Sequence, residues 1–118
     1  MIEDSSKLVA EIEAADPVEQ AELLCDAWDL LARPGWADAD RSAQFMRCID
    51  AEAFESAAIM LVPEGAFPTL DFVERRCWLR DGSGFDLAFG VAHGRGSTIA
   101  LALVAACLRA RNNQEAGR

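Results

Sequence analysis

The chain has 118 residues and a mass of 12.8 kDa, which suits one domain (residues 1–118) with a hydrophobic core of its own. Hydrophobic residues make up 52% of it, yet no apolar run approaches the roughly 20 residues that a membrane-spanning helix needs. We therefore expect no membrane partner. The net charge of −9 repels phosphate backbones, so we also expect no direct nucleic-acid partner.

The first six residues are polar and acidic and lack the basic region of a signal peptide, so we expect a cytoplasmic protein. Four cysteines stand apart among apolar neighbours without a C-x-x-C pair, which favours reduced core thiols. Since the chain has one histidine and no paired ligand knuckles, we expect no metal and no cofactor.

The charge is unevenly distributed. Residues 1–62 hold 14 acidic and four basic residues, a net charge of −10, whereas residues 63–118 hold six acidic and seven basic residues, a net charge of +1. Such an acidic half either serves solubility alone or attracts a basic protein surface.

Two helices are expected in the acidic N-terminal portion, residues 1–40. The first is capped by Ser5 or Ser6 and ends near Asp16. The second begins at Asp16-Pro17-Val18-Glu19, which has the residues of a capping box with proline at the first helical position, and it runs to about Arg33.

At about 100° per residue, one side of the second helix is acidic, and two leucines border it. Trp36 follows in a loop, where it either anchors a partner or packs beneath the loop. The partner-binding face expected from this pattern comprises Glu19, Glu22, Leu23, Asp26, Asp29, Leu30 and Trp36. The alternative is an ordinary solvated helix face.

Residues 41–111 are expected to form a helix-strand-strand-helix portion. A helix reaches Leu61, with a candidate break near residues 48–50. Two antiparallel strands follow at about 67–80 and 85–92, and a buried helix covers about 97–111. The fold class is therefore α+β, with a frayed tail at 112–118.

A two-stranded hairpin is marginal in water unless helices cover it or a second chain extends its edge. A homodimer is therefore one alternative for this chain.

The turn before the last helix, His93-Gly94-Arg95-Gly96-Ser97-Thr98, is glycine-rich and could hold an anion through His93, Arg95, Ser97 and Thr98. It lacks the spacing and the lysine of a P-loop, and an ordinary strand-to-helix turn is the alternative. No partner for His93 as a general base is suggested by spacing, so we expect no catalytic residue and no enzyme.

Two segments, Ser56-Ala57-Ala58-Ile59-Met60-Leu61-Val62-Pro63-Glu64-Gly65 and Thr98 to Arg111, resemble motifs of short proteins common in proteobacterial prophages and temperate phages, similar to those grouped as phage α-β-α sandwich domains. The resemblance covers about residues 50–111. Ser56, Ala66 and Ile99 depart from the family pattern. The resemblance implies an origin in a mobile element and a bacterial host cytoplasm, and it brings no catalytic residues.

Together these features predict a non-enzymatic, prophage-encoded protein that binds a host protein with a basic surface. An inhibitor of a nucleic-acid-handling defence complex, such as an anti-CRISPR, would fit this description. One alternative is an oligomeric structural or assembly accessory of a phage particle. The other is a small anion- or nucleotide-binding domain that uses the turn at 93–98.

Overall fold

The computed structural model describes residues 2–31, 39–63, 65–81 and 91–116. The elements, in chain order, are α1 (Ile2–Ala14), the 3-10 helix η1 (Pro17–Glu19), α2 (Gln20–Leu31), α3 (Ala39–Asp50), α4 (Phe54–Ile59), β1 (Ala66–Asp71), β2 (Arg76–Asp81), β3 (Val91–Arg95) and α5 (Ile99–Ala116). This arrangement confirms the α+β class.

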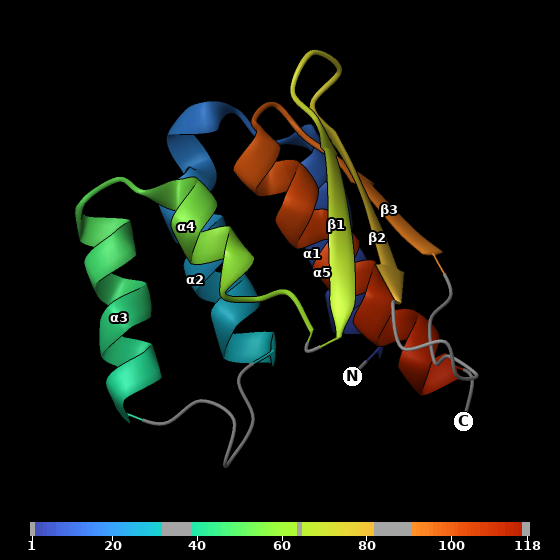
Figure 1. The fold of residues 1–118 in the computed structure, drawn as a ribbon, viewed down its shortest axis with the longest axis horizontal. Coiled ribbons are helices and arrows are strands. Elements are labelled where there is room, and N and C mark those ends of the chain that lie inside the picture. The colour runs from blue at the N-terminus through green and yellow to red at the C-terminus, as the bar shows by residue number, and fades with distance from the viewer. Residues whose placement is uncertain (1, 32–38, 64, 82–90, 117–118) are drawn as a thin grey trace.

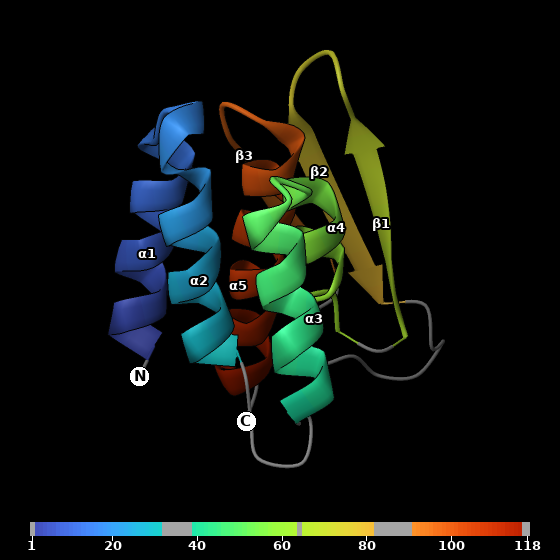
Figure 2. The same cartoon turned by 90° about the vertical axis from the view of Figure 1, so that its left-hand side faces the viewer.

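Helix α5 lies at the centre of the fold. The three strands pack on one side of it, and α1, α2 and α4 pack around its other sides. Figure 1 shows the sheet lying over α5, and Figure 2 shows α1 and α2 on the side of α5 opposite the sheet. The molecule therefore has a helical side, a central helix and a sheet whose second face no described helix covers.

The N-terminal helices follow the expected apolar spacing but differ in their boundaries. Ser5 and Ser6 lie inside α1, which begins at Ile2, so neither serine is the N-cap. The Asp16 capping box forms as expected, because the Asp16 N–H donates to Glu19 Oε1 at 3.2 Å.

The helical stretch expected up to Leu61 is interrupted between Asp50 and Phe54. Glu52 adopts a φ of +57° there, and α4 begins without a capping side chain. The break lies just after the expected 48–50. It lets α4 pack against α5, while Phe45 of α3 stacks on Trp28 of α2 with ring centroids 4.4 Å apart.

Within the described ranges, the sheet has three antiparallel strands in the order β1-β2-β3. The segment expected as one strand, 67–80, is two strands, because Asp71 Oδ1 accepts the N–H groups of Val73 and Glu74 and turns the chain. Arg75 completes the turn with a φ of +55°. The expected 85–92 strand lies mostly outside the described residues. β3 begins at Val91 and includes His93-Gly94-Arg95, which were expected as a turn.

The strong apolar run of α5 explains its central position. Every residue from Ile99 to Leu108 is buried, as the sequence predicts. Strand β3 approaches α5 so closely that a Cβ at Gly94 would overlap the backbone of Ala102 and Ala106, so only glycine fits there. The helix also continues through Ala116 into the segment expected as a frayed tail.

Candidate functional site

Four carboxylates of the expected partner-binding face lie exposed along η1 and α2: Glu19, Glu22, Asp26 and Asp29. We call these four residues the acidic face. Residues three and four apart share one side of a helix, and the opposite side of α2 is held in the core by Leu24 and Ala27. The helix therefore presents the carboxylates on a rigid support.

The apolar residues expected to border this face are not available for docking. Leu23 is only 6% exposed, and Leu30 is half-buried against the core. Neighbouring helices cover these side chains, which a single-helix projection cannot show. Val18 in η1 is the exposed apolar residue beside the carboxylates, at 87%. Trp36 lies outside the described residues.

The electrostatic effect of the acidic face is visible at Cys25. Burial raises the pKa of this thiol, and the carboxylates of Asp29, Asp26 and Asp50 raise it further. Because Asp50 is the last residue of α3, the negative potential extends from α2 to the neighbouring helix.

The residues expected at an anion-binding turn are divided among three environments. His93 lies on β3, where its ring is tilted by 44° against Trp78 at a centroid distance of 5.2 Å. Thr98 caps α5, because its Oγ1 accepts the N–H of Leu101 at 3.2 Å and donates to Gln20 Oε1 at 2.9 Å. Arg95 and Ser97 line a separate pocket described below.

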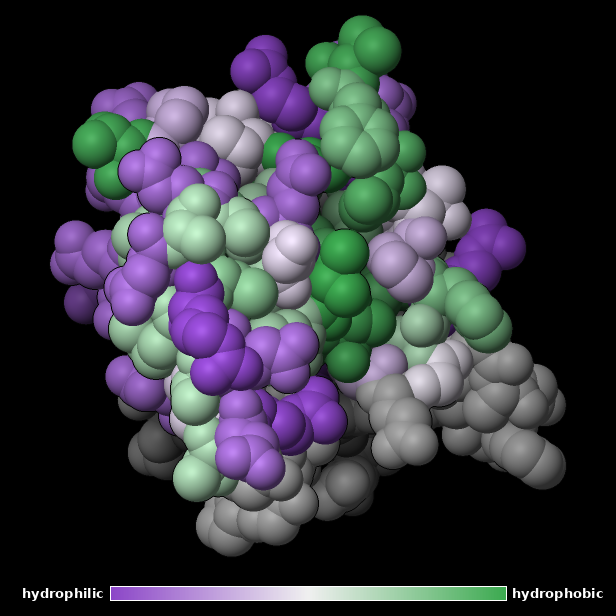
Figure 3. Space-filling model, turned by 60° about the vertical axis from the view of Figure 1, so that its left-hand side comes forward, coloured by the Kyte–Doolittle hydropathy of each residue, from purple (hydrophilic) through white to green (hydrophobic). Residues whose placement is uncertain are grey.

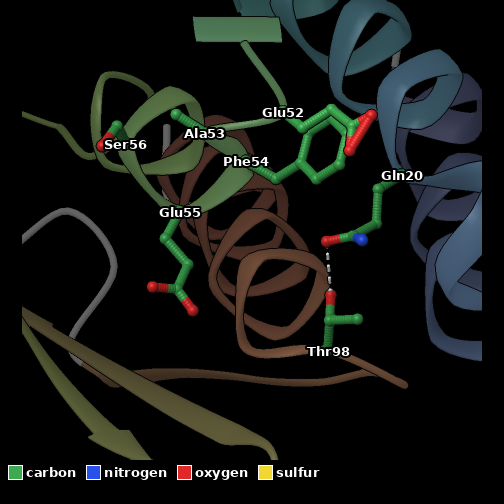
Figure 4. A pocket seen from close by; sticks show the side chains of 7 residues that line it. All are labelled: Gln20, Glu52, Ala53, Phe54, Glu55, Ser56 and Thr98. Carbon is green, nitrogen blue, oxygen red and sulfur yellow. Dashed lines mark hydrogen bonds between the residues drawn. The ribbon is translucent and has the colours of Figure 1, made fainter.

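The capping hydrogen bond of Thr98 lies at the wall of an open pocket of about 540 Å³, where α2, α4 and α5 begin. Figure 4 shows the bond between Gln20 and Thr98 on one side of this pocket and Glu55 and Ser56 on α4. Glu52 and Phe54 complete its wall. The described lining contains carboxylates, an amide and hydroxyls, so it offers hydrogen bonds but no cation for an anion.

A second pocket, of about 420 Å³, lies at the end of the sheet where α1 ends and α5 begins. Its lining includes three arginines and one serine: Arg75, Arg76, Arg95 and Ser97. Ser97 Oγ is buried and has no hydrogen-bond partner in the described part of the chain. Arg75 Nη1 donates to the Ser97 carbonyl at 3.3 Å, which ties the turn before β2 to the start of α5.

Two carboxylates also line this pocket, Glu13 and Glu74. Glu13 is already neutralised, because Arg109 forms a bidentate ion pair with it. The same pair covers the edge of β3: Glu13 Oε2 accepts the Arg95 N–H at 3.3 Å, and Arg109 donates to the His93 carbonyl at 2.8 Å.

The face of the sheet that no described helix covers continues from this pocket, and Trp78 and His93 on it are half-buried. The register places Thr69, Trp78 and His93 in one row and Asp71, Arg76 and Arg95 in the next. On β2 the alternating residues Cys77 and Leu79 are buried, so Arg76, Trp78 and Arg80 lie on the opposite, outer face. We call Phe67, Arg76, Trp78, Arg80, His93 and Arg95 the outer sheet face.

The sequence-based candidates did not include Arg75, Arg76, Trp78 or Arg80. The sequence contains part of the evidence for this surface, because Arg76, Trp78 and Arg80 alternate with apolar Cys77 and Leu79 at the period of a strand. The approach of Arg75 and Arg76 to Arg95 depends on the pairing of β2 with β3, which no local pattern provides.

An apolar strip lies on another side of the molecule, between α4 and β1. Figure 3 shows apolar side chains gathered between polar surfaces there. Exposed Ile59 and Phe72, with Leu70, Ile99 and Leu103, line a depression of about 140 Å³. Exposed apolar patches of this kind are typical of interaction surfaces.

Within the described ranges, no three His, Cys, Asp or Glu side chains gather where they could hold a metal ion. All four cysteines are free thiols. Cys77 and Cys107 are buried, as the sequence predicts for core residues, whereas Cys25 and Cys48 are only partly buried at the border of the core. Among the described helices, none combines the length and the hydropathy that crossing a bilayer requires.

Comparisons of this chain with protein-family models, with curated proteins and with solved structures find no match. The resemblance of residues 50–111 to phage proteins therefore stays a prediction.

Proposed function

We propose that this protein is a non-enzymatic, prophage-encoded protein that binds a basic surface of a host protein through its acidic face. An inhibitor of a nucleic-acid-handling defence complex, of the anti-CRISPR kind, would act in this way. The observation that carries the proposal is the exposure of Glu19, Glu22, Asp26 and Asp29 on one side of η1 and α2.

The charge arrangement of α2 favours a cationic partner. Like charges at i and i+4, such as Glu22 and Asp26, destabilise a helix by about 0.2–0.5 kcal/mol per pair. The cations of a basic partner surface would attract these carboxylates, offset the repulsion among them and accelerate association. Proteins that handle nucleic acids carry such basic surfaces.

The apolar contribution to binding must come from a residue other than Leu23, because that side chain is buried. Val18 is exposed immediately before Glu19 and is the candidate for this role. Its β-branched side chain has few rotamers, so ordering it on binding has a small entropic cost.

The test is affinity capture from a bacterial host extract with three forms of the tagged chain. These are the natural sequence, Glu22→Lys/Asp26→Lys on the acidic face, and Glu11→Lys/Glu55→Lys as a control with the same charge change at exposed sites elsewhere. We expect one basic partner to be retained by the natural chain and the control and lost from the face variant.

The captured partner is then assayed on its nucleic-acid substrate with each form added. Inhibition by the natural chain and the control, but not by the face variant, supports the proposal. A partner that the face variant retains as strongly as the natural chain contradicts it.

The apolar strip favours a second candidate, an oligomeric structural or assembly accessory. Among the described strands β1 pairs only with β2, so no described strand pairs with its other edge, which lies beside exposed Ile59 and Phe72. A second copy on this side would cover both features. Sedimentation of the natural chain and of Phe72→Glu tests this candidate, which requires an oligomer that the substitution dissociates.

A further inference from the structure

The outer sheet face combines cations with aromatic rings. Arg76 and Arg80 flank Trp78 on the same side of β2, four residues apart, which corresponds to about 13 Å along a strand. His93 lies against Trp78 on the neighbouring strand. On β1, the strand on the other side of β2, Phe67 is 62% exposed and pairs with Arg80.

The pocket at the end of the sheet adds further cations. Arg75 and Arg95 join Arg76 around it, and the buried Ser97 hydroxyl lacks a hydrogen-bond partner in the described chain. Guanidinium groups and hydroxyls are the donors that bind phosphate oxygens.

The potential at this end of the sheet also affects His93. Burial lowers the pKa of His93, and the guanidinium groups of Arg76, Arg109 and Arg95 lower it further, while Glu13 raises it. The lowered pKa favours the neutral imidazole, which lies beside the Trp78 ring with its Nε2 buried and without a hydrogen-bond partner in the described chain.

On this face and around the pocket, four arginines (Arg75, Arg76, Arg80 and Arg95) outnumber the two carboxylates of Asp71 and Glu74, and the acidic face of α2 does not cancel this positive region. α2 packs against α5, and α5 packs against the sheet, so two layers of roughly 8–10 Å each separate the acidic face from the outer sheet face. Physiological salt screens charges beyond about 8 Å. The expectation of no direct nucleic-acid binding rests on the net charge of the whole chain. The local charge of the outer sheet face differs from that sum, because the acidic face lies on the helical side of the molecule.

We propose that the outer sheet face and the adjoining pocket bind a single-stranded nucleic acid. One phosphate group lies at Arg75, Arg76 and Arg95 in the pocket, and a base stacks on Trp78. Arg80 contacts a second phosphate beyond that base, which is why a strand fits this surface better than a free mononucleotide. Cations that follow the backbone, combined with aromatic platforms for the bases, are the general chemistry of single-strand binding.

The test uses a fluorescein-labelled oligothymidylate of about ten nucleotides, which lies within the size range of single-strand sites. Fluorescence anisotropy measures its affinity for the full chain over a range of salt concentrations. Unlabelled thymidine monophosphate, duplex DNA of the same length and polyglutamate serve as competitors. We expect the oligonucleotide to bind best, and each competitor to be at least tenfold weaker.

The charge contribution is tested by Arg76→Gln/Arg80→Gln. Its matched control is Lys7→Gln/Arg47→Gln, two exposed cations on the helical side. Each phosphate contact adds about 0.7 to the salt slope for a single strand, so the sheet variant should lower the slope by about 1.4. The control should leave both affinity and slope unchanged.

The stacking contribution is tested at Trp78 with two replacements. Trp78→Leu should weaken binding about tenfold, the loss expected for one stacked base, whereas Trp78→Phe should retain most of the affinity. Quenching of tryptophan emission by the oligonucleotide should occur in the natural chain and disappear in Trp78→Phe.

Three outcomes would overturn the proposal. The first is polyglutamate binding as tightly as the oligonucleotide without dependence on Trp78, which would indicate an acidic polypeptide as the partner. The second is equal affinity for duplex and single strand. The third is an equal loss in the control and sheet variants, provided that circular dichroism shows the sheet variant to be folded.

Discussion

Arg109 of α5 and Glu13 of α1 form a bidentate ion pair, with Arg109 Nη2 and Glu13 Oε1 2.8 Å apart. The same two side chains bond to backbone groups on the edge of β3, the Arg95 N–H and the His93 carbonyl. The two residues are 96 positions apart in the chain. Through this pair the first helix, the last helix and the edge strand are joined at one place, and the edge is covered against pairing with another chain.

A double-mutant cycle of Glu13→Gln and Arg109→Met should reveal this coupling. We expect an interaction energy of about 1 kcal/mol, near the lower end of the values found for contacting residues. The value is low because the Arg109 side chain is 38% exposed, so solvent screens its charge. Urea unfolding of the four proteins measures it. Strictly additive losses would show that the edge is held by other contacts.

Replacement of Gly94 by alanine should destabilise the protein strongly. The added Cβ overlaps backbone atoms of α5, which cannot rotate away, so the cost should reach or exceed the ~1–3 kcal/mol of ordinary overpacking. Gly65→Ala is the control, because Gly65 has a φ of +83° and open space around it, so the loss there is only about 1 kcal/mol. Thermal unfolding compares the two variants. Similar melting temperatures would contradict the close approach of β3 to α5.

Thr98→Val should lower the stability of α5 at its first turn. The substitution removes the bond to the Leu101 N–H and the bond to Gln20, and loss of an N-cap costs about 1 kcal/mol. Thr98→Ser keeps both bonds and should remain near the natural stability. Urea midpoints separate the two variants, and equal losses would show that the methyl group contributes as much to stability as the hydroxyl and its hydrogen bonds.

His93 should make the protein less stable as the medium becomes mildly acidic. Its pKa in the folded protein lies below the ordinary value of 6.5, so below about pH 6.5 the unfolded chain binds more protons than the folded one. The free energy of unfolding should therefore fall as the pH decreases below about 7, and His93→Gln should reduce that fall.

Because the chain contains one histidine, an NMR titration follows this residue without ambiguity. The titration midpoint should lie below 6.5. A midpoint at or above that value would contradict the burial of His93 and the positive charges around it.

The two buried thiols should be inert in the folded protein. Burial raises the pKa of Cys77 to about 11, and burial together with Cys77 raises the pKa of Cys107 still further above the ordinary value. At about pH 8 a thiol reagent should therefore modify at most Cys25 and Cys48, and all four cysteines after unfolding. A reagent that releases one chromophore for each modified thiol gives the number of reactive cysteines by absorbance. Rapid modification of Cys77 in the native state would contradict its burial.

Much of the fold could be predicted because it depends on local periodicity. The apolar run from Ile99 to Leu108 predicts a buried helix, and α5 is one. The spacing of Glu22, Asp26 and Asp29 places them on one exposed side of α2, as found. Within 67–80, the Asp71 side chain breaks the strand by accepting two backbone N–H groups, a local competition that the β-forming composition of the segment concealed.

The sequence by itself determined the α+β class, the central apolar helix and the carboxylates of the acidic face, because each follows from the spacing of residues along one element. Only the tertiary structure decided that Leu23 is buried, that Glu13 meets Arg109, and that Arg75 and Arg76 gather with Arg95 beside Trp78. Those relationships join residues from different elements. They arise from the packing of β3 on α5 and the pairing of β2 with β3, which bring distant residues together for reasons that no short stretch of the chain contains.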